Sequence, residues 1–519
     1  MTPITKLLLL CVFTCIVSVS SGARILCVYP VPFHSHQAVF NALSEALARA
    51  GHQVVALTPL PHPAPPPGLT QIDVHQLSYR LWEEGYKKFQ HDNGGFGVDF
   101  ITTWTQLSPV LHKIVESQIE TPEMQAIIKD PKQHFDVILV EAVIPLSIMV
   151  AARFKAPVIQ VSSFFGGNDN FMAMGVPVHP IIFPEFGARK TWKFSFWDKI
   201  SSVYDFIRMR RFESSIRATE NAIIRKHFGE NAPTVEELQK NIHMLFLNVH
   251  QIWDNNRPVP PSVLYMGALH VKKPKPIPEN FKKYLDASKN GVIYVSLGSK
   301  FLFSDLPDED VRVFMKVFAD IPYDVLLKWN GGDLPNKPPN VRLEKWIPQN
   351  DILHHPKIKA FVTQGGLQST DEAIAANVPL IGFPVIGDQW YNAQKYEQFG
   401  IGIELDIKNV QEENLRNAIL SVASEKSYRE NITRLSEVMR EQRQGGLEKA
   451  VYWTEYVATR GALHLRSPLA DAPLVDYFML DVIAAAFASV LIAITVILVL
   501  IGGIFKSFRR ETHVKVKRN

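Results

Sequence analysis

The chain has 519 residues, of which 46% are hydrophobic and 20% are charged. This length and composition indicate a globular protein of two or more domains, and they exclude a small binding module, a widely disordered chain and a multi-span membrane protein. The formal net charge is +4, and basic residues concentrate after residue 505, so the body is nearly neutral. A nearly neutral body has no basic face suited to nucleic acid.

Residues 1–22 have the layout of a secretory signal peptide. Lys6 precedes an apolar stretch over residues 7–19, and small residues follow it as far as Gly22. An uncleaved anchor is the alternative, although this stretch is short for a bilayer span. Cleavage would leave Cys27 as the single cysteine of the mature chain, so we expect no intramolecular disulfide.

The first half of the body, residues 23–252, begins with a parallel βαβ pattern. Apolar residues at helical spacing from Val39 to Ala50 predict a helix that ends at Gly51. Apolar runs on either side of it, and two further along the chain, predict strands over residues 25–29, 54–57, 135–141 and 157–162. A longer helical pattern covers residues 194–227.

Residues 253–280 contain two proline-rich stretches that cannot continue a helix or an inner strand, so we expect an inter-domain linker there. The second half, residues 281–445, alternates strand and helix patterns more regularly. Its predicted strands cover residues 292–297, 324–328, 341–346, 360–363, 379–383 and 401–405. Two doubly wound halves place a cleft at the carboxyl ends of their strands. Asn431 begins the N-x-S/T acceptor pattern for glycosylation.

Residues 482–505 carry no charge and are long enough to cross a bilayer as a helix. The basic tail, residues 506–519, is expected to stay cytosolic, which places the body in the lumen. Its last five residues resemble a dilysine signal for retrieval to the endoplasmic reticulum, and a plain stop-transfer anchor is the alternative. We therefore expect a single-pass type I protein of the endoplasmic reticulum membrane.

The most informative stretch, residues 361–373, reads as strand, Gly-Gly turn and helix. Glycines allow a phosphate to approach the backbone, and the free N–H groups at the helix start can then hold it. Glu372 follows Gly365 by two helical turns and could accept hydrogen bonds from two ribose hydroxyls, whereas Asp371 is expected to face solvent. The pattern is neither the GxGxxG dinucleotide fingerprint nor a P-loop.

Three neighbouring features strengthen this interpretation. Ser299 follows another predicted strand and could contact a phosphate. Trp346 could stack on a base. Asp388 and Gln389 offer an acceptor beside an amide, a combination suited to sugar hydroxyls.

Together, Trp346, Pro348-Gln349, residues 361–372 and Asp388-Gln389 resemble the signature of the UDP-glycosyltransferases, which include the animal UDP-glucuronosyltransferases. The resemblance extends over nearly the whole chain. It implies the GT-B fold, an α/β architecture in which two Rossmann-like domains face a cleft, together with a transmembrane helix. The N-terminal domain would bind the acceptor and the C-terminal domain the UDP-sugar, while residues 446–478 would pack back toward the N-terminal domain.

The resemblance also implies roles for individual residues. Trp346 would stack on uracil and Gln349 would contact the nucleoside. Glu372 would bind the ribose, and Asp388 and Gln389 the sugar. The diphosphate would lie against Ser299, Gln364, Gly366 and Ser369. The family usually has His where this chain has Gln364, so we expect weaker charge compensation there.

His36 is the candidate general base, because an imidazole can take a proton from an acceptor hydroxyl near neutral pH. The resemblance pairs it with Glu141 at the end of a later strand. The family usually has Asp at that position, so direct contact with the longer Glu is an open question.

The expected reaction is inverting transfer of a sugar from a UDP-sugar donor to a hydroxyl of a small lipophilic acceptor, with glucose favoured slightly over glucuronate. We expect no metal and no cofactor, because no His/Cys cluster has metal-ligand spacing. A homo-oligomer is left open. The alternatives are a non-catalytic lumenal protein that binds lipophiles, and a transferase acting on a protein or a membrane lipid.

Overall fold

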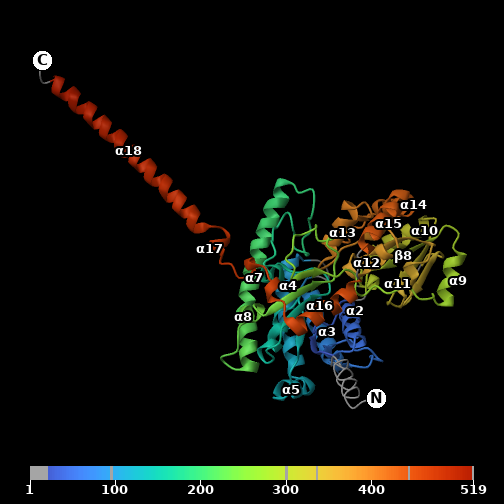
Figure 1. The fold of residues 1–519 in the computed structure, drawn as a ribbon. Helices are drawn as coiled ribbons and strands as arrows, with labels where there is room; N and C mark the ends of the chain where they lie inside the picture. Colours follow the sequence, from blue (N-terminus) through green and yellow to red (C-terminus); the bar gives the residue numbers. More distant parts are fainter. Residues whose placement is uncertain (1–21, 94–97, 299–301, 335–336, 442–444, 517–519) are drawn as a thin grey trace, which may run out of the picture. The chain divides into compact units, whose positions relative to one another are not determined.

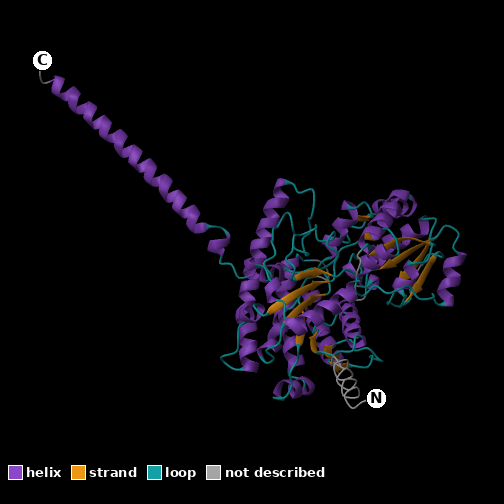
Figure 2. Cartoon of the chain, viewed as in Figure 1, coloured by secondary structure: helices purple, strands orange, loops and turns teal. Residues whose placement is uncertain are grey.

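The computed structural model describes residues 22–93, 98–298, 302–334, 337–441 and 445–516 (Figure 1). Residues 1–21 of the predicted signal peptide and residues 517–519 of the predicted basic tail therefore lie outside the described residues. The chain divides into two compact units, residues 1–466 and 467–519. The first unit carries two parallel β-sheets with helices between their strands (Figure 2).

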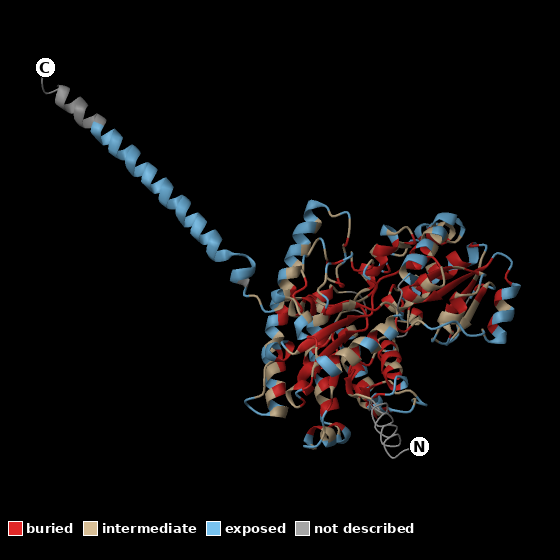
Figure 3. Cartoon of the chain, in the orientation of Figure 1, coloured by how far each residue is buried: buried red, intermediate tan, exposed pale blue. Residues whose placement is uncertain are grey.

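The first sheet has seven parallel strands in the order β3-β2-β1-β4-β5-β6-β7. Its inner strands are buried along their length, as expected for a parallel sheet covered on both faces (Figure 3). The strands are β1 (Arg24–Val28), β2 (Gln53–Thr58), β3 (Leu69–Asp73), β4 (Val137–Glu141), β5 (Val158–Ser162), β6 (Ile242–Leu247) and β7 (Val263–Tyr265). The associated helices are α2 (His34–Arg49), α3 (His75–Asp92), α4 (Phe100–Ile119), α5 (Pro122–Lys129), α6 (Asn168–Ala173), α7 (Phe196–Phe228) and α8 (Val235–Gln239), with the 3₁₀ helix η1 (Pro145–Ala152).

The second sheet has six parallel strands in the order β10-β9-β8-β11-β12-β13. The strands are β8 (Val292–Ser296), β9 (Asp324–Lys328), β10 (Val341–Glu344), β11 (Ile358–Thr363), β12 (Leu380–Gly382) and β13 (Gly402–Glu404). The helices are α9 (Glu279–Ala287), α10 (Asp308–Asp320), α11 (Gln349–Leu353), α12 (Leu367–Ala375), α13 (Gln389–Gln398), α14 (Glu412–Ser424) and α15 (Lys426–Arg440). Both sheets reverse their winding once, between β1 and β4 and between β8 and β11, and these reversals are the points where doubly wound sheets bind ligands.

The proline-rich region predicted as a linker over residues 253–280 contains strand β7. This three-residue strand extends the first sheet at its edge, and Pro260 and Pro261 lie just before it rather than inside it. Proline is tolerated next to an edge strand, because the outer edge needs no backbone donor there. The connection between the sheets is consequently shorter than predicted. Strands β3 and β6 were also missing from the prediction.

Helix α16 (Gly446–Arg460) follows the second sheet in sequence but packs against α2 of the first half. The ring of His52 pairs with Glu455 at 3.0 Å, and the backbone N–H of Ala462 donates to the ring of His243 at 2.7 Å. The chain therefore returns to the first half before residue 467, over part of the segment predicted at residues 446–478.

The second unit contains α17 (Leu474–Tyr477) and the long helix α18 (Leu480–Val516). Within α18, residues 480–507 are long and apolar enough to cross a membrane, and their side chains are exposed. This segment contains the predicted span at residues 482–505 and exceeds it by a few residues at both ends. The helix continues into the predicted tail.

Candidate active site

A cleft of about 530 Å³ is lined by residues of both halves, at the carboxyl ends of the strands that flank the two reversals. Direct contacts close to the cleft join the halves. The Gln368 side chain donates to the carbonyl of Ser163 at 2.9 Å, and the indole of Trp253 donates to Asn392 at 2.8 Å. The topology thus brings the sequence-predicted groups of both halves to one place.

His36 and Glu141 contact each other directly across the reversal of the first sheet. His36 lies in the first turn of α2, which follows β1, and Glu141 ends β4. The Nδ1 atom of His36 is 3.0 Å from Oε1 of Glu141, and the other carboxylate oxygen accepts a hydrogen bond from the Val31 N–H. The longer Glu side chain therefore reaches the imidazole, which answers the question left open by the sequence.

The loop before α2 is held in place by a buried amide. The side chain of Gln37 donates to the carbonyls of Tyr29 and Val31, so the first turn of α2 is anchored to the end of β1. Burial raises the pKa of Glu141, and its hydrogen bonds from His36 and Val31 act in the opposite direction. An ionised Glu141 would fix the imidazole with its proton on Nδ1, leaving Nε2 as the basic nitrogen.

The Gly-Gly turn connects β11 to α12 in the second half. Gly365 has φ +88°, a conformation that favours glycine, and a side chain there would also approach the Gln389 carbonyl to 3.2 Å. A Cβ atom at Gly366 would meet nothing closer than the Gln364 amide at 3.8 Å. Gly366 is the N-cap of α12, and it lines the cleft together with Gln368 and Ser369 of the first turn, whereas the Leu367 N–H is bonded to Asp388.

Gln349 joins three other polar residues in one network at this wall. Its amide nitrogen donates to Ser369 Oγ at 3.0 Å and to Glu372 Oε2 at 2.7 Å, and its oxygen accepts from the Tyr294 hydroxyl at 3.0 Å. Burial raises the pKa of Glu372 to about 7, against the effect of the Gln349 hydrogen bond. Three of the sequence-predicted residues thus lie together, and Tyr294 is an addition that the sequence did not reveal.

Asp388 and Gln389 line the same cleft and are fixed by the backbone around them. Asp388 Oδ2 accepts from the Leu367 N–H at 3.0 Å and from Asn392 at 2.7 Å. The Gln389 oxygen accepts from the N–H groups of Val385 and Ile386 at 2.7 and 2.8 Å. What Gln389 can still offer a ligand is therefore its amide nitrogen, a donor, beside the second carboxylate oxygen of Asp388.

Trp346 follows β10 and its side chain is 65% exposed, which leaves the indole face open for stacking. Lys328, which sequence reasoning missed, ends β9, and its ammonium lies 5.4 Å from the centre of the Trp346 ring. Lys328 Nζ also donates to the Gly298 carbonyl at 3.0 Å, and burial lowers its pKa. A lysine at the carboxyl end of a predicted apolar strand was the signal that could have revealed it.

Gln364 lies beside Gly298 and lines the cleft between β8 and β11. Ser299, predicted as a phosphate contact, lies outside the described residues. Asn431 lies within helix α15, and the side-chain nitrogen that would carry a glycan donates to the Gly400 carbonyl at 3.0 Å. A glycan on Asn431 would have to displace that contact in the folded protein.

The expectation that Asp371 faces solvent is wrong. Its side chain is buried, with Oδ2 unpartnered, and burial raises its pKa well above the usual range, with Glu372 and Asp388 adding to the effect. The helical turn that places Glu372 at the cleft directs Asp371 toward the packed side of α12. A protonated Asp371 adds no negative charge close to the proposed phosphate site.

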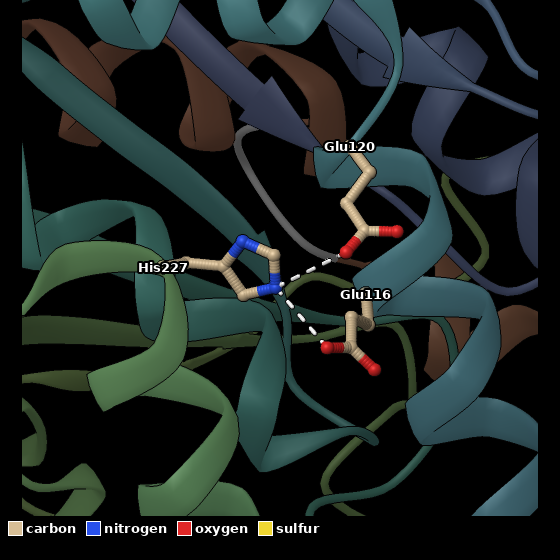
Figure 4. A group of neighbouring side chains, drawn as sticks. All are labelled: Glu116, Glu120 and His227. Carbon is tan, nitrogen blue, oxygen red and sulfur yellow. Dashed lines mark hydrogen bonds and ion pairs between the residues drawn. The ribbon is translucent and has the colours of Figure 1, made fainter.

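One group within the described residues has the ligand types and spacing of a metal site. Glu116 and Glu120 of α4 face His227 of α7 (Figure 4). However, the ammonium of Lys226 lies 2.7 Å from Glu116 and 3.1 Å from Glu120, and it supplies positive charge to both carboxylates. Since these residues do not line the cleft, we interpret the group as an ion-pair network joining two helices.

Comparisons of the sequence with known proteins show what this chain is similar to. The sequence model described as "UDP-glucoronosyl and UDP-glucosyl transferase" matches residues 25–518. The chain is 35% identical over 497 residues to the ecdysteroid UDP-glucosyltransferase of Spodoptera littoralis nuclear polyhedrosis virus, covering 92% of this chain and 96% of that protein. It is 31% identical over 489 residues to UDP-glucosyltransferase 2 of Dactylopius coccus, covering 92% of each.

Solved structures support the fold. The calicheamicin glycosyltransferase CalG4 matches with a TM-score of 0.54 at 19% identity, covering 85% of this chain and 99% of that one. This likeness and the two parallel sheets confirm the GT-B fold predicted from the sequence.

Proposed function

The chain belongs to the UDP-glycosyltransferase family, and from that premise we propose that it transfers glucose from UDP-glucose to a hydroxyl of a small lipophilic acceptor, with His36 as general base. The observation that carries the proposal is the pairing of His36 with Glu141 at a cleft that the first turn of α12 also lines. A base and an anion-binding helix facing one cavity are what direct displacement requires.

In the proposed reaction, the acceptor oxygen attacks the anomeric carbon of the sugar as its proton passes to Nε2 of His36. The bond from that carbon to the UDP oxygen breaks, and attack from the opposite face inverts the anomeric centre. Glu141 stabilises the resulting imidazolium through Nδ1. The start of α12 stabilises the negative charge that develops on UDP, and this step calls for no metal or cofactor.

The choice of glucose rests on the charge at the sugar end of the cleft. Asp388 contributes a carboxylate there, and among the described lining residues Lys328 is the one Lys or Arg. Lys328 lies beside Trp346, where the base of the nucleotide is proposed to stack, rather than beside the sugar. A glucuronate carboxylate next to Asp388 would be repelled, whereas neutral hydroxyls can bind. The relatives named UDP-glucosyltransferases agree with this choice.

The choice of a lipophilic acceptor rests on the aromatic lining of the N-terminal wall. The side chains around His36 on this wall include Phe33, Trp82, Phe100, Trp104, Phe164 and Phe186. Such a lining favours a ligand with a large apolar area and a single hydroxyl presented to the imidazole. Relatives named for ecdysteroids would act on ligands of this kind.

We further propose that residues 480–507 span the membrane of the endoplasmic reticulum, with the catalytic unit lumenal and the tail cytosolic. The uninterrupted apolar exposure of this helix and the basic residues that follow support this topology. Protease treatment of sealed microsomes should remove only the tail. Digestion of the catalytic unit in intact microsomes would contradict the topology.

The experiment that tests the activity is a competition among UDP-glucose, UDP-glucuronate and UDP-N-acetylglucosamine for transfer to a panel of phenols and steroids. We expect UDP-glucose to dominate and turnover to persist in EDTA. Preference for UDP-glucuronate would contradict the donor assignment. Tight binding of lipophiles without turnover of any donor would show a binding protein instead.

A further inference from the structure

The first three turns of α7 expose an apolar surface that no described part of the protein covers. Six large hydrophobic side chains lie at helical spacing on this face, and Phe196 and Trp197 are 69% and 73% exposed. The face consists of Phe196, Trp197, Ile200, Val203, Tyr204 and Ile207. We refer to it as the α7 face. In Figure 3 this end of the helix is coloured mostly as exposed, with some intermediate residues.

The rest of α7 behaves differently. The buried residues of this helix begin at Met209, where it packs against α4. On the exposed side, the positions that continue the α7 face by further turns are Arg211, Ser214 and Ala218. The large apolar side chains therefore stop after Ile207, although the exposed side of the helix continues. The apolar stretch is local and is not explained by packing against any residue that the structure describes.

The surroundings of the α7 face are strongly basic. Residues 189–211 contain seven Lys or Arg residues and two Asp residues. Lys193, Lys199 and Arg211 are exposed beside the apolar side chains. Within the same stretch, Asp205 is paired with Arg208 at 3.1 Å, and Asp198 accepts a hydrogen bond from the Ser195 N–H at the helix start. Arg208 also pairs with Asp99 at 3.3 Å, and Arg210 pairs with Glu213 at 2.5 Å, so the positive charge at the border of the face rests mainly on the three exposed residues named above.

We propose that the α7 face is a membrane-docking surface that lies in the headgroup region of the bilayer leaflet facing the catalytic unit. Aromatic and aliphatic side chains on one face, with basic residues at its border, are the composition of helices that lie in the plane of a membrane interface. The apolar side chains enter the boundary between headgroups and acyl chains, and the basic side chains contact lipid phosphates. The inference goes beyond the proposed transfer reaction and adds a second membrane contact to the proposed span.

Electrostatics favour a lipid surface over a second copy of this chain. An isologous dimer through the α7 face would bring the basic borders of two molecules together, so that the like charges repel. The phosphate groups of lipid headgroups instead offer acceptors to the same side chains.

The test uses the full chain in vesicles of phosphatidylcholine and phosphatidylglycerol, with an environment-sensitive dye on Trp197→Cys. Ser214→Cys, two turns beyond the α7 face on the same side of α7, is the matched control. The native Cys27 is buried and should not react with the dye. We expect blue-shifted emission at position 197 and quenching by nitroxide lipids several-fold greater than at position 214, with a smaller effect in pure phosphatidylcholine.

Equal quenching at the two positions would overturn the proposal, whether or not the chain floats with the vesicles. If the protein still floats with the vesicles after carbonate extraction, the proposed transmembrane helix is inserted. This result does not depend on the α7 face, so the two proposals can fail separately. Efficient cross-linking between Trp197→Cys protomers in vesicles would identify a second copy as the occupant and also overturn it. A second test uses the triple variant Phe196→Ser, Trp197→Ser and Ile200→Ser with the dye attached at position 204. In detergent its donor KM should be unchanged. In vesicles the dye should no longer show blue-shifted emission.

Discussion

The two walls of the cleft differ in the interactions that hold their functional side chains in place. On the N-terminal wall, His36 is set among aromatic side chains and is held by a direct contact of 3.0 Å with Glu141. On the C-terminal wall, polar side chains bond to one another and to the backbone, as in the network of Gln349, Ser369 and Glu372. The proposed base is thus preorganised in an apolar setting, whereas the proposed donor site is a set of satisfied hydrogen bonds that a nucleotide would exchange for its own.

This contrast predicts which mutations act on turnover and which act on binding. Changes on the N-terminal wall should reduce kcat with little effect on donor KM, because the pair acts in the transition state. Changes on the C-terminal wall should act mainly on donor KM, because those residues would contact the nucleotide before and during the reaction.

After removal of the proposed base itself, the largest effect is expected for Glu141→Ala. Loss of the carboxylate removes the partner of His36 Nδ1 and the charge that stabilises the imidazolium, so kcat should fall by roughly 10²–10⁴. The fall in kcat is measured by steady-state kinetics with saturating UDP-glucose. Glu141→Gln should also lose most of the activity, because its amide has one acceptor oxygen for two donors, the Nδ1–H of His36 and the N–H of Val31.

Glu220→Ala is the matched control for Glu141→Ala. Glu220 is a buried carboxylate paired with His112 at 3.2 Å in the same half, away from the lining of the cleft. Its loss should lower stability but leave kcat per folded molecule unchanged. Equal losses of kcat in both variants would show that Glu141 acts only through the fold.

Trp346→Ala should act on donor binding. Stacking on a base contributes about 1–3 kcal/mol, so the KM for UDP-glucose should rise roughly 5- to 150-fold, with a smaller change in kcat. Trp329→Ala provides the control, because Trp329 lies near the same strand ends but does not line the cleft. An unchanged donor KM in Trp346→Ala would remove the indole from the nucleotide site.

The pH dependence of donor binding should reflect Glu372, whose pKa burial raises to about 7. Only the ionised carboxylate can accept two ribose hydroxyls, so the KM for UDP-glucose should rise as pH falls through 7. The free energy of unfolding of the free protein should instead be higher at low pH. An acid with a raised pKa favours folding at low pH, and this contribution is lost as pH rises through 7.

Glu372→Gln should flatten both of these profiles while preserving the shape of the side chain. The measurements are donor KM and Tm between pH 5.5 and 8.5. A profile of donor KM that persists unchanged in Glu372→Gln would assign the titration to another group.

The smallest effect is expected for Gln364→His. A protonated imidazole would add a charge-assisted hydrogen bond to the diphosphate, so donor KM should fall by about two- to tenfold, most clearly near pH 6. A rise in KM at every pH would indicate that Gln364 is needed for its packing beside Gly298.

The sequence was most informative where a motif and a strand end coincide. The fold class and most central strands of both halves could be predicted from buried apolar runs separated by helical patterns, although the buried inner strand β6 was missed. Edge strands were harder. β3 and the three-residue β7 have weak patterns, and β7 lies in a region rich in proline.

In the candidate site, the sequence located the residues with distinctive chemistry and missed those that act through position. Lys328 and Tyr294 lie on predicted strands, and nothing in their immediate neighbours shows that the strand ends converge on the Trp346 loop and on Gln349. The orientation of Asp371 was misjudged for a related reason, since adjacent residues on a helix differ by about 100° and only the packing decides which one is buried.

The most direct test of the proposed mechanism is a single-turnover measurement on His36→Ala, paired with calorimetric binding of UDP-glucose. If His36 activates an acceptor across the cleft from an independent donor site, donor affinity should stay close to that of the unmodified protein while the transfer rate to a phenol falls by roughly 10²–10⁴. Transfer at the full rate, or loss of donor binding in step with loss of transfer, would contradict that account.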